Sequence, residues 1–475
     1  MPGTCTAMAV VCGLLISAAA IAQDSSADYP HAFQKEALEL FRTAISYRTA
    51  HGQSQVPALA EYLADRFRAG GFAAGDVHVL PVRMPDGDRT ASLVVRYRGD
   101  GSSARKPILL LAHMDVVDAR PEDWERDPFT LIEENGFFFG RGTWDDKVGV
   151  ANLTSTFLRL KAEGFVPSRD LIIAFTGDEE TNQVTVRRLV TEHRELVDAE
   201  FALNDDGGGG ALSHDGKPVA YYVQTSEKMY ATFELTVRNS GGHSSAPRAD
   251  NAIYELATVL KRLEAFRFPV RINDTTRGYF EATARVTDGP VGEAMRRFAR
   301  DPDDSSAADV LAREPNQVGV TRTTCVATML RAGHADNALA QSATATVNCR
   351  IFPGESGDEV RATLARIAGD GVSISGSGDA TPSPVSPLQD DVMAAVTAAV
   401  ESRYPGTPVV PLMAPYATDG MVTRVAGIPT YGTMGVFIRP EDEFAHGLNE
   451  RVPVRSFYEG LDHWYGILKR LGRPE

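Results

Sequence analysis

The chain has 475 residues, of which 43% are hydrophobic and 23% are charged, a composition typical of a folded protein with about three domains. Its formal net charge of −15 argues against nucleic-acid binding, because phosphates require a basic face. After the N-terminal stretch, no segment approaches the roughly 20 continuous apolar residues of a membrane span. We therefore expect no nucleic-acid partner and no membrane segment in the mature protein.

The N-terminus carries an apolar stretch, "AMAVVCGLLISAAAIAQD", followed by polar residues. Ala20-Ile21-Ala22 fits a small-x-small cleavage site, so residues 1–22 are predicted to be a signal peptide. The protein would then be periplasmic or secreted. The segment before the apolar stretch lacks Lys and Arg, which leaves a retained anchor as the alternative. Cleavage would also remove Cys5 and Cys12.

The next part of the chain alternates helical and strand patterns. Apolar residues at helical spacing predict helices over 33–46 and 57–68. A third helix is predicted from about 145 to 163. Buried strands are predicted in "SLVVRYRG", "PILLLAHMD", "DLIIAFTG" and "AEFALND". This alternation indicates an α/β fold with a mainly parallel central sheet, whose first part we place at residues 31–226.

The pattern changes near residue 226. The segment "MYATFELTVRNSGGHSS" alternates like a half-exposed strand, and a helix is predicted near 250–265. An irregular insertion at about 266–318 is followed by two strands, a helix near 357–368 and the strand "VSISGSG". This β-α-β-β-α-β order predicts a ferredoxin-like α+β domain at 227–380. The α/β pattern resumes at 381–475, with helices at 389–403 and 455–471.

Two cysteines remain in the mature chain, Cys325 and Cys349. They lie in "TTCVATML" and "SATATVNCRIF", which flank a turn near residue 337. If the segment folds back there, the two residues lie roughly opposite each other. A disulfide and a pair of buried thiols are both consistent with this arrangement.

Polar residues follow several of the predicted strands. Because ligands of open α/β sheets bind at the carboxyl ends of strands, side chains far apart in the sequence can converge there. Each motif taken alone is also consistent with an ordinary core histidine, helix cap or surface turn. The argument depends on their joint occurrence. The residues concerned are His113, Asp145, Glu180, Asp205 and His446.

Two imidazoles and three carboxylates suit two divalent cations, with zinc favoured and cobalt or manganese as alternatives. One carboxylate can bridge two metals about 3.5–4 Å apart. The stretch "LIIAFTGDEE" places three carboxylates side by side, and metal cations would offset their repulsion. Glu180 would bind metal, and Glu179 would remain free to take a proton from a metal-activated water.

The motifs "LLAHMDVV", "W..DPF", "GRGTWDDK", "GDEE", "GGHSSAP", "NCRIFPG" and "AHGLNE" together resemble one family over about residues 31–472. It is the co-catalytic di-zinc metallohydrolase family that includes acetylornithine deacetylase, succinyl-diaminopimelate desuccinylase, glutamate carboxypeptidase, carnosinase and the aminoacylases. The resemblance implies a zinc-exopeptidase-like catalytic domain interrupted by a lid and dimerisation domain. It also implies a homodimer formed through that inserted domain.

The resemblance implies a role for each residue of the site. Asp115 orients His113, and a non-proline cis peptide often follows the bridging aspartate, here Asp145–Asp146. Asp206 is the alternative to Asp205 in "NDDGGGG". The implied metal ligands are His113 and Asp205 for one zinc, Glu180 and His446 for the other, and Asp145 for both, with Glu179 as the general base.

Further residues are implied to contact the substrate. His243 would stabilise the oxyanion, often across the dimer interface. Asn337 and Arg350 would bind substrate, with Arg350 holding a free carboxylate or, alternatively, forming a structural ion pair. Thr418 and Asp419 are expected to border the pocket.

These features predict an exported zinc-dependent hydrolase that cleaves an amide or peptide bond next to a free carboxylate. A dipeptidase or carboxypeptidase is favoured, because export suits the scavenging of peptides. An N-acyl-amino-acid deacylase with the same site is the alternative, so the expected partner is a small peptide or an N-acyl amino acid. A non-catalytic binding module is a distant alternative, and no Gly-x-Ser-x-Gly motif supports a serine hydrolase.

Overall fold

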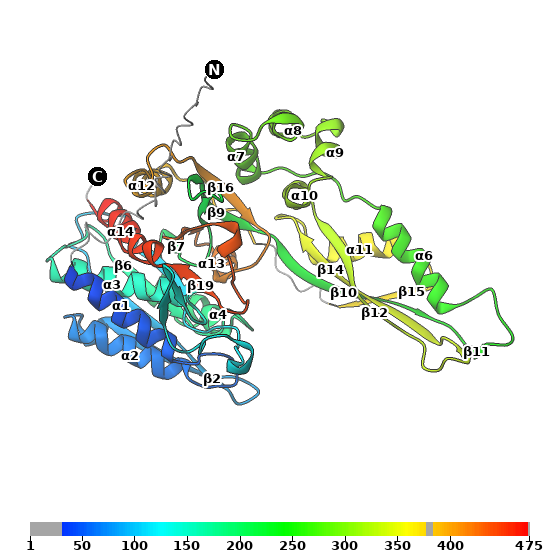
Figure 1. Cartoon of the computed structure of the whole chain (residues 1–475), viewed down its shortest axis with the longest axis horizontal. Helices are drawn as coiled ribbons and strands as arrows, with labels where there is room; N and C mark the ends of the chain where they lie inside the picture. Colours follow the sequence, from blue (N-terminus) through cyan, green and yellow to red (C-terminus); the bar gives the residue numbers. More distant parts are fainter. Residues whose placement is uncertain (1–30, 377–382, 474–475) are drawn as a thin grey trace, which may run out of the picture.

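The computed structural model describes residues 31–376 and 383–473. The chain forms a larger body around a central sheet and a smaller lid that extends to one side (Figure 1). The signal-peptide prediction concerns residues outside the described part. None of the described helices has the length and apolarity needed to cross a bilayer.

The central sheet is parallel through its middle and antiparallel at the β1–β2 edge, which confirms the predicted α/β class. The strand order is β1-β2-β6-β3-β7-β17-β9-β8-β18, and β16 pairs with β9. The strands are β1 (Val77–Arg83), β2 (Arg89–Tyr97), β3 (Ile108–His113), β6 (Leu171–Thr176), β7 (Phe201–Asn204), β8 (Gly209–Leu212), β9 (Pro218–Glu227), β16 (Val409–Ala414), β17 (Thr430–Gly432) and β18 (Phe437–Ile438).

Helices cover both faces of this sheet, because the inner strands are apolar on both sides. In β3, Leu110 belongs to one apolar cluster and Leu111 to another on the opposite face. The helices of this body are α1 (His31–Ser46), α2 (Val56–Ala69), α3 (Lys147–Ala162), α4 (Val184–Thr191), α5 (Arg194–Val197), α12 (Asp390–Glu401), α13 (Asp419–Val425) and α14 (Val454–Leu471). Short elements complete it: η2 (Ala74–Asp76), η3 (Pro121–Asp123), η4 (Pro440–Asp442), β4 (Ile132–Glu134), β5 (Phe137–Phe139) and β19 (Arg451–Pro453).

The lid has the predicted β-α-β-β-α-β order, and its sheet runs β12-β14-β10-β15. One face of this sheet packs against its two helices. Lys228 is the single residue between β9 of the central sheet and β10 of the lid. The lid consists of β10 (Met229–Arg238), α6 (Ala252–Ala265), β12 (Thr324–Ala332), β14 (Ser342–Ile351), α11 (Gly357–Ala368) and β15 (Val372–Gly376), with β11 (Gly242–His243) and β13 (Ala338–Leu339) paired at its tip.

The insertion at 266–318 was predicted to be irregular, and this prediction was wrong. The segment forms four short helices, the last of which ends at residue 321. Its polar stretches begin helices: Asn273 forms a capping box with Thr276, and the Asp304 side chain accepts from the amide of Ala307. The apolar faces pack on Ala220 of β9 and Val410 of β16, beside the junction of the two bodies (Figure 1). The helices are α7 (Asp274–Thr283), α8 (Gly289–Arg300), α9 (Ser305–Leu311) and α10 (Pro315–Thr321).

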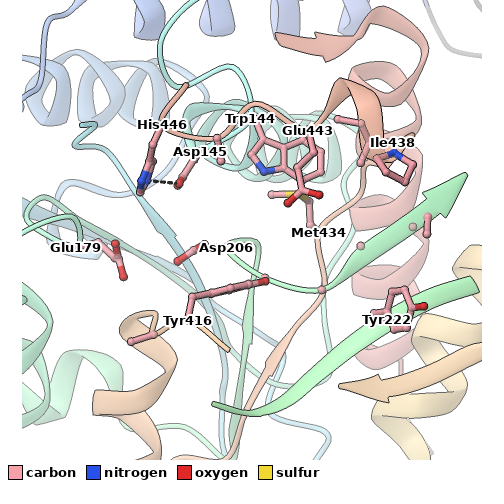
Figure 2. Close-up of a pocket in the computed structure, with 18 of the residues that line it drawn as sticks. Trp144, Asp145, Glu179, Asp206, Tyr222, Tyr416, Met434, Ile438, Glu443 and His446 are labelled. Atoms are coloured by element: carbon pink, nitrogen blue, oxygen red, sulfur yellow. Dashed lines mark ion pairs between the residues drawn. The ribbon is translucent and has the colours of Figure 1, made fainter. Parts of the chain in front are cut away.

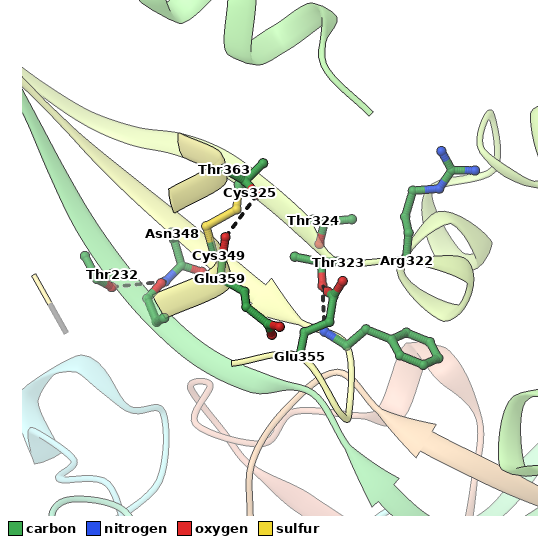
Figure 3. Close-up of a disulfide and its surroundings, with 12 residues drawn as sticks. Thr232, Arg322, Thr323, Thr324, Cys325, Asn348, Cys349, Glu355, Glu359 and Thr363 are labelled. Atoms are coloured by element: carbon green, nitrogen blue, oxygen red, sulfur yellow. Dashed lines mark hydrogen bonds between the residues drawn. A yellow bond between two sulfur atoms is a disulfide. The ribbon is translucent and has the colours of Figure 1, made fainter. Parts of the chain in front are cut away.

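Cys325 and Cys349 form a disulfide in the lid (Figure 3). The two residues are direct cross-strand partners in the β12–β14 pair. Of the two alternatives left by the sequence, the structure has the disulfide.

Candidate active site

The polar residues predicted to converge do so at one edge of the central sheet. His113 ends β3, Glu179 and Glu180 follow β6, and Asp206 follows β7. Asp145 lies two residues before the start of α3, and His446 comes from the loop before β19. Figure 2 shows Asp145, Glu179, Asp206 and His446 around one pocket.

Asp145 lies between the two imidazoles. Its Oδ1 is 2.8 Å from Nε2 of His113, and its Oδ2 is 2.9 Å from Nε2 of His446. Nε2 of His446 is also 3.1 Å from Oε1 of Glu180. The two carboxylate oxygens therefore face two separate donor sets, which is the arrangement expected of a bridging ligand. The Asp145–Asp146 peptide bond is cis, as the resemblance implies.

The structure places Asp206, and not Asp205, at the cluster. Asp206 lines the pocket and shares a potential metal triad with His113 and Glu179. Asp205 points to the opposite face, where a Cβ atom added to Gly149 of α3 would overlap its Oδ2. Successive residues of an extended segment point to opposite faces, so a shift of one residue moves the carboxylate out of the site. The sequence-based preference for Asp205 was therefore wrong, and Asp206 is the residue at the cluster.

The acidic loop after β6 is held by backbone hydrogen bonds. Asp115 accepts the amides of Glu179 and Glu180, each at 3.1 Å. Nδ1 of His113 is 3.0 Å from the backbone oxygen of Asp115 and 3.5 Å from its carboxylate. Asp178 accepts the amides of Val184 and Thr185 at the start of α4. Asp115 thus orients the loop as well as His113, and the third carboxylate of the stretch has a structural role.

A buried ion pair that sequence reasoning missed supports Asp145. Glu450 is fully buried, forms an ion pair with Arg141, and accepts the amides of Gly142, Trp144 and Asp145. Arg141 and Glu450 are 309 residues apart in the sequence, so no local pattern indicates their contact. The pair fixes the loop that presents Asp145 to both imidazoles.

The electrostatics of the site reflect its crowded carboxylates. Burial, reinforced by Asp206, raises the pKa of Glu179 well above its ordinary value, and burial also raises the pKa of Glu180. Burial favours a higher pKa for Asp145, but hydrogen bonds from the two imidazoles hold it below its ordinary value. Hydrogen bonds to Asp145 and Glu180 raise the pKa of His446 to about 10. The carboxylates therefore repel one another, and positive charge stabilises their ionised forms.

The donor set fits metal ions. The described residues contain two triads of potential metal ligands, and within each triad the ligand atoms lie within 4.8 Å of one another. Imidazole nitrogens and carboxylate oxygens together are the donors that zinc prefers. The triads are His113, Asp145 and Glu180, and His113, Glu179 and Asp206.

The cluster opens into a pocket of about 390 Å³, within the range of about 300–1,000 Å³ typical of small-molecule sites. Its far side is apolar. Figure 2 shows Tyr222 and Ile438 on the side of the pocket opposite to Glu179 and His446. Sequence reasoning did not identify the wall residues, which include Trp144, Ala211, Tyr222, Tyr416, Met434, Ile438 and Glu443.

Thr418 and Asp419 lie behind the pocket wall and do not line it. Thr418 donates its backbone amide and its hydroxyl to Glu227, each at 2.8 Å, and Asp419 accepts the hydroxyl of Thr176. Both side chains are buried. The preceding residue Tyr416 lines the pocket instead, so the expectation that Thr418 and Asp419 contact substrate is not supported.

The lid residues divide into two groups. His243 and Asn337 are exposed and adjacent at the tip, where the amide of Ser244 donates to the oxygen of Asn337. Figure 1 shows that this tip, at β11, is remote from the larger body. Arg350 instead lies near the pocket, because it donates to the oxygen of Pro415, next to Tyr416. Within one chain, only Arg350 of the three approaches the site.

Comparison with known proteins gives the context of this site. Residues 109–470 match the description "Peptidase family M20/M25/M40". The chain belongs to this family. The suspected family, the fold class and the assignment as an enzyme are thereby confirmed: the protein is a hydrolase that acts on amide bonds.

Three similar proteins illustrate the range. The N-fatty-acyl-amino acid synthase/hydrolase PM20D1 of Xenopus tropicalis is 32% identical over 355 residues, covering 73% of this chain and 69% of the relative. An M20 family metallo-carboxypeptidase from Sulfolobus solfataricus has a TM-score of 0.68 at 19% identity, covering 92% of this chain and 99% of its own. A dinuclear metal binding M20 peptidase from Bacillus subtilis has a TM-score of 0.57 at 12% identity, covering 92% and 98%.

Proposed function

We propose that the protein is a zinc-dependent hydrolase that removes an apolar acyl group from an amino acid with a free carboxylate. The observation that carries this proposal is the pocket, which has the imidazole–carboxylate cluster on one side and apolar residues on the other. The similarity to a relative named for N-fatty-acyl-amino acids supports it. This reverses our sequence-based preference for a dipeptidase or carboxypeptidase.

The residues of the chain divide the chemical work. His113, Asp145, Glu180, Asp206 and His446 would hold two zinc ions, which when bound polarise the scissile carbonyl and activate water. Glu179 takes a proton from the attacking water and returns it to the leaving amine. Burial raises the pKa of Glu179, which makes the carboxylate a better proton acceptor.

The orientation of the substrate follows from one charged residue, Arg350, and from the apolar far side of the pocket. Arg350 lies over the ring of Tyr230, with its guanidinium carbon 4.9 Å from the ring centroid, and donates to Pro415. Both contacts leave the positive charge of Arg350 without a carboxylate partner among the described residues, so it is placed to accept the free carboxylate of the amino acid. The acyl group then extends toward Met434, Tyr222 and Ile438.

A dipeptidase is the second candidate, and one residue favours it. Glu443 is an exposed carboxylate in the pocket lining, where it could pair with the α-ammonium of a dipeptide. An acyl amino acid has no such ammonium group. Glu443→Gln should therefore weaken dipeptide cleavage and leave cleavage of acyl amino acids within about twofold.

The test is hydrolysis by the purified mature protein, followed by mass spectrometry. The substrates are N-acyl amino acids and dipeptides that share the same C-terminal residue, each assayed after metal removal and after zinc is restored. Zinc-dependent cleavage of the acyl amino acids supports the proposal. Cleavage of dipeptides alone would favour the second candidate, and Glu179→Gln is the inactive control.

We also propose that the protein is exported after removal of residues 1–22. This rests on the apolar stretch and the cleavage site in the sequence, and a lid disulfide is compatible with an oxidising compartment. Cell fractionation and N-terminal sequencing test it. A mature chain that begins at Gln23 supports export, whereas an intact Met1 in a membrane fraction indicates the retained anchor.

A further inference from the structure

The far side of the pocket is formed by neighbouring strands whose residues share one face. Ala211 of β8 pairs with Ile438 of β18 and with Ala220 of β9, and Gly209 pairs with Tyr222. Directly paired residues point to the same side of a sheet. We call the four pocket-lining members of this face, Gly209, Ala211, Tyr222 and Ile438, the acyl wall.

Small side chains leave room along this wall. Gly210, between the two small wall residues, faces the opposite side, where a Cβ atom would overlap the ring of Phe437. Gly209 has a φ of +104°, and a Cβ atom there would lie 3.3 Å from the oxygen of Val436. A larger residue at Gly209 is therefore strained. Ala211 has no positive φ, so it is the wall position at which side-chain size can change without backbone strain.

Two members of the acyl wall, Tyr222 and Ile438, lie away from the reacting centre. Figure 2 places Tyr222 and Ile438 across the pocket from Glu179, Asp206 and His446, with Met434 between the two groups. We expect a short acyl group bound at the cluster to end before it reaches Tyr222 and Ile438. A long acyl group must pass along it, so bulk added at the wall meets only the distal part of a substrate.

The insertion supports the same strands. Ala220, the partner of Ala211, belongs to the apolar cluster that includes Tyr279 and Phe280 of α7, and Tyr222 packs against that cluster. The insertion helices therefore border the wall on its own face, and on the opposite face Tyr221 and Phe437, the partners of Gly210, are buried in the main apolar core. A rigid wall cannot move aside to accommodate added volume, since tightly packed interiors respond to even one extra methylene.

We propose that Ala211 determines the longest acyl group that the enzyme accepts. This inference rests on the proposed function and extends it to a residue that controls substrate length. It makes the acyl wall, rather than the metal cluster, the origin of selectivity among acyl amino acids.

The experiment compares N-acetyl-, N-octanoyl- and N-dodecanoyl-leucine as substrates for the zinc-loaded mature protein. In Ala211→Phe, the ratio of kcat/KM for dodecanoyl-leucine to that for acetyl-leucine should fall by roughly tenfold to 100-fold. Ala211→Val should produce a smaller fall. Ile438→Ala, which removes bulk from the same wall, should shift the ratio toward the longer substrate.

Val219→Phe is the matched control, because Val219 lies on the neighbouring strand β9, is 40% exposed and does not line the pocket. Its substrate ratio should equal that of the wild type. A wild-type enzyme that cleaves no acyl length refutes the proposed function and this inference with it. A wild-type enzyme that cleaves the series, with the ratio unchanged in Ala211→Phe and Ala211→Val, refutes this inference alone.

Discussion

Replacing Arg424 by Met should destabilise the junction between the two bodies. The Arg424 and Glu227 side chains are 1% and 0% exposed, and Nη1 lies 2.7 Å from Oε1. Glu227 also accepts from Gln224 and twice from Thr418. Removing one partner of a buried pair costs about 3–5 kcal/mol. Because three neutral donors remain on Glu227, we expect about 3 kcal/mol in Arg424→Met.

Urea unfolding followed by tryptophan fluorescence measures this loss as a lower midpoint at unchanged slope. Arg188→Met is the control, since the Arg188–Glu192 pair is 34% and 54% exposed and is worth no more than about 1 kcal/mol. Glu227→Gln combined with Arg424→Met removes the uncompensated charge and should recover part of the loss. A cost below about 1 kcal/mol for Arg424→Met would refute the reasoning.

Other predictions concern the site. Glu179→Gln should lower kcat by ~10²–10⁴ at unchanged metal content, and full activity would exclude Glu179 as the base. Asp206→Asn should lower bound zinc by mass spectrometry, whereas Asp205→Asn should retain it; the opposite result would restore our first assignment. His243→Ala should lower kcat by ~10²–10³ if the histidine stabilises the oxyanion. Because His243 lies at the remote lid tip, we expect it to act on the site of the partner subunit in a homodimer. Mixing the His243→Ala and Glu179→Gln proteins should then restore activity. No recovery of activity, or a monomer in sedimentation, would contradict this.

The sequence predicted the elements because their signals are local. Helix α11 has the predicted bounds of 357–368, since the apolar spacing and the Ser356 cap lie within one segment. The buried strands β3 and β6 were recognisable from continuous apolar runs bounded by polar residues. The insertion was the exception. Its short helices are separated by polar capping residues, which in the sequence are typical of loops.

The ligand set was predictable for a similar reason. His113 ends one buried strand, Glu179 and Glu180 follow another within four residues, and parallel strands carry such residues to one edge of the sheet. The choice between Asp205 and Asp206 was not predictable. It depends on which face each residue presents at the end of β7, and a one-residue shift reverses that.

The sequence by itself determined the fold class, the family resemblance and nearly all of the residues that converge on the metal cluster, because each is encoded by local periodicity or by a short motif. Only the tertiary structure decided the Arg141–Glu450 support, the place of Thr418 behind the wall, the remote position of His243 and the pocket lined by Ala211 and Ile438. These features are contacts between segments up to several hundred residues apart. Their formation depends on packing geometry, which no local pattern specifies.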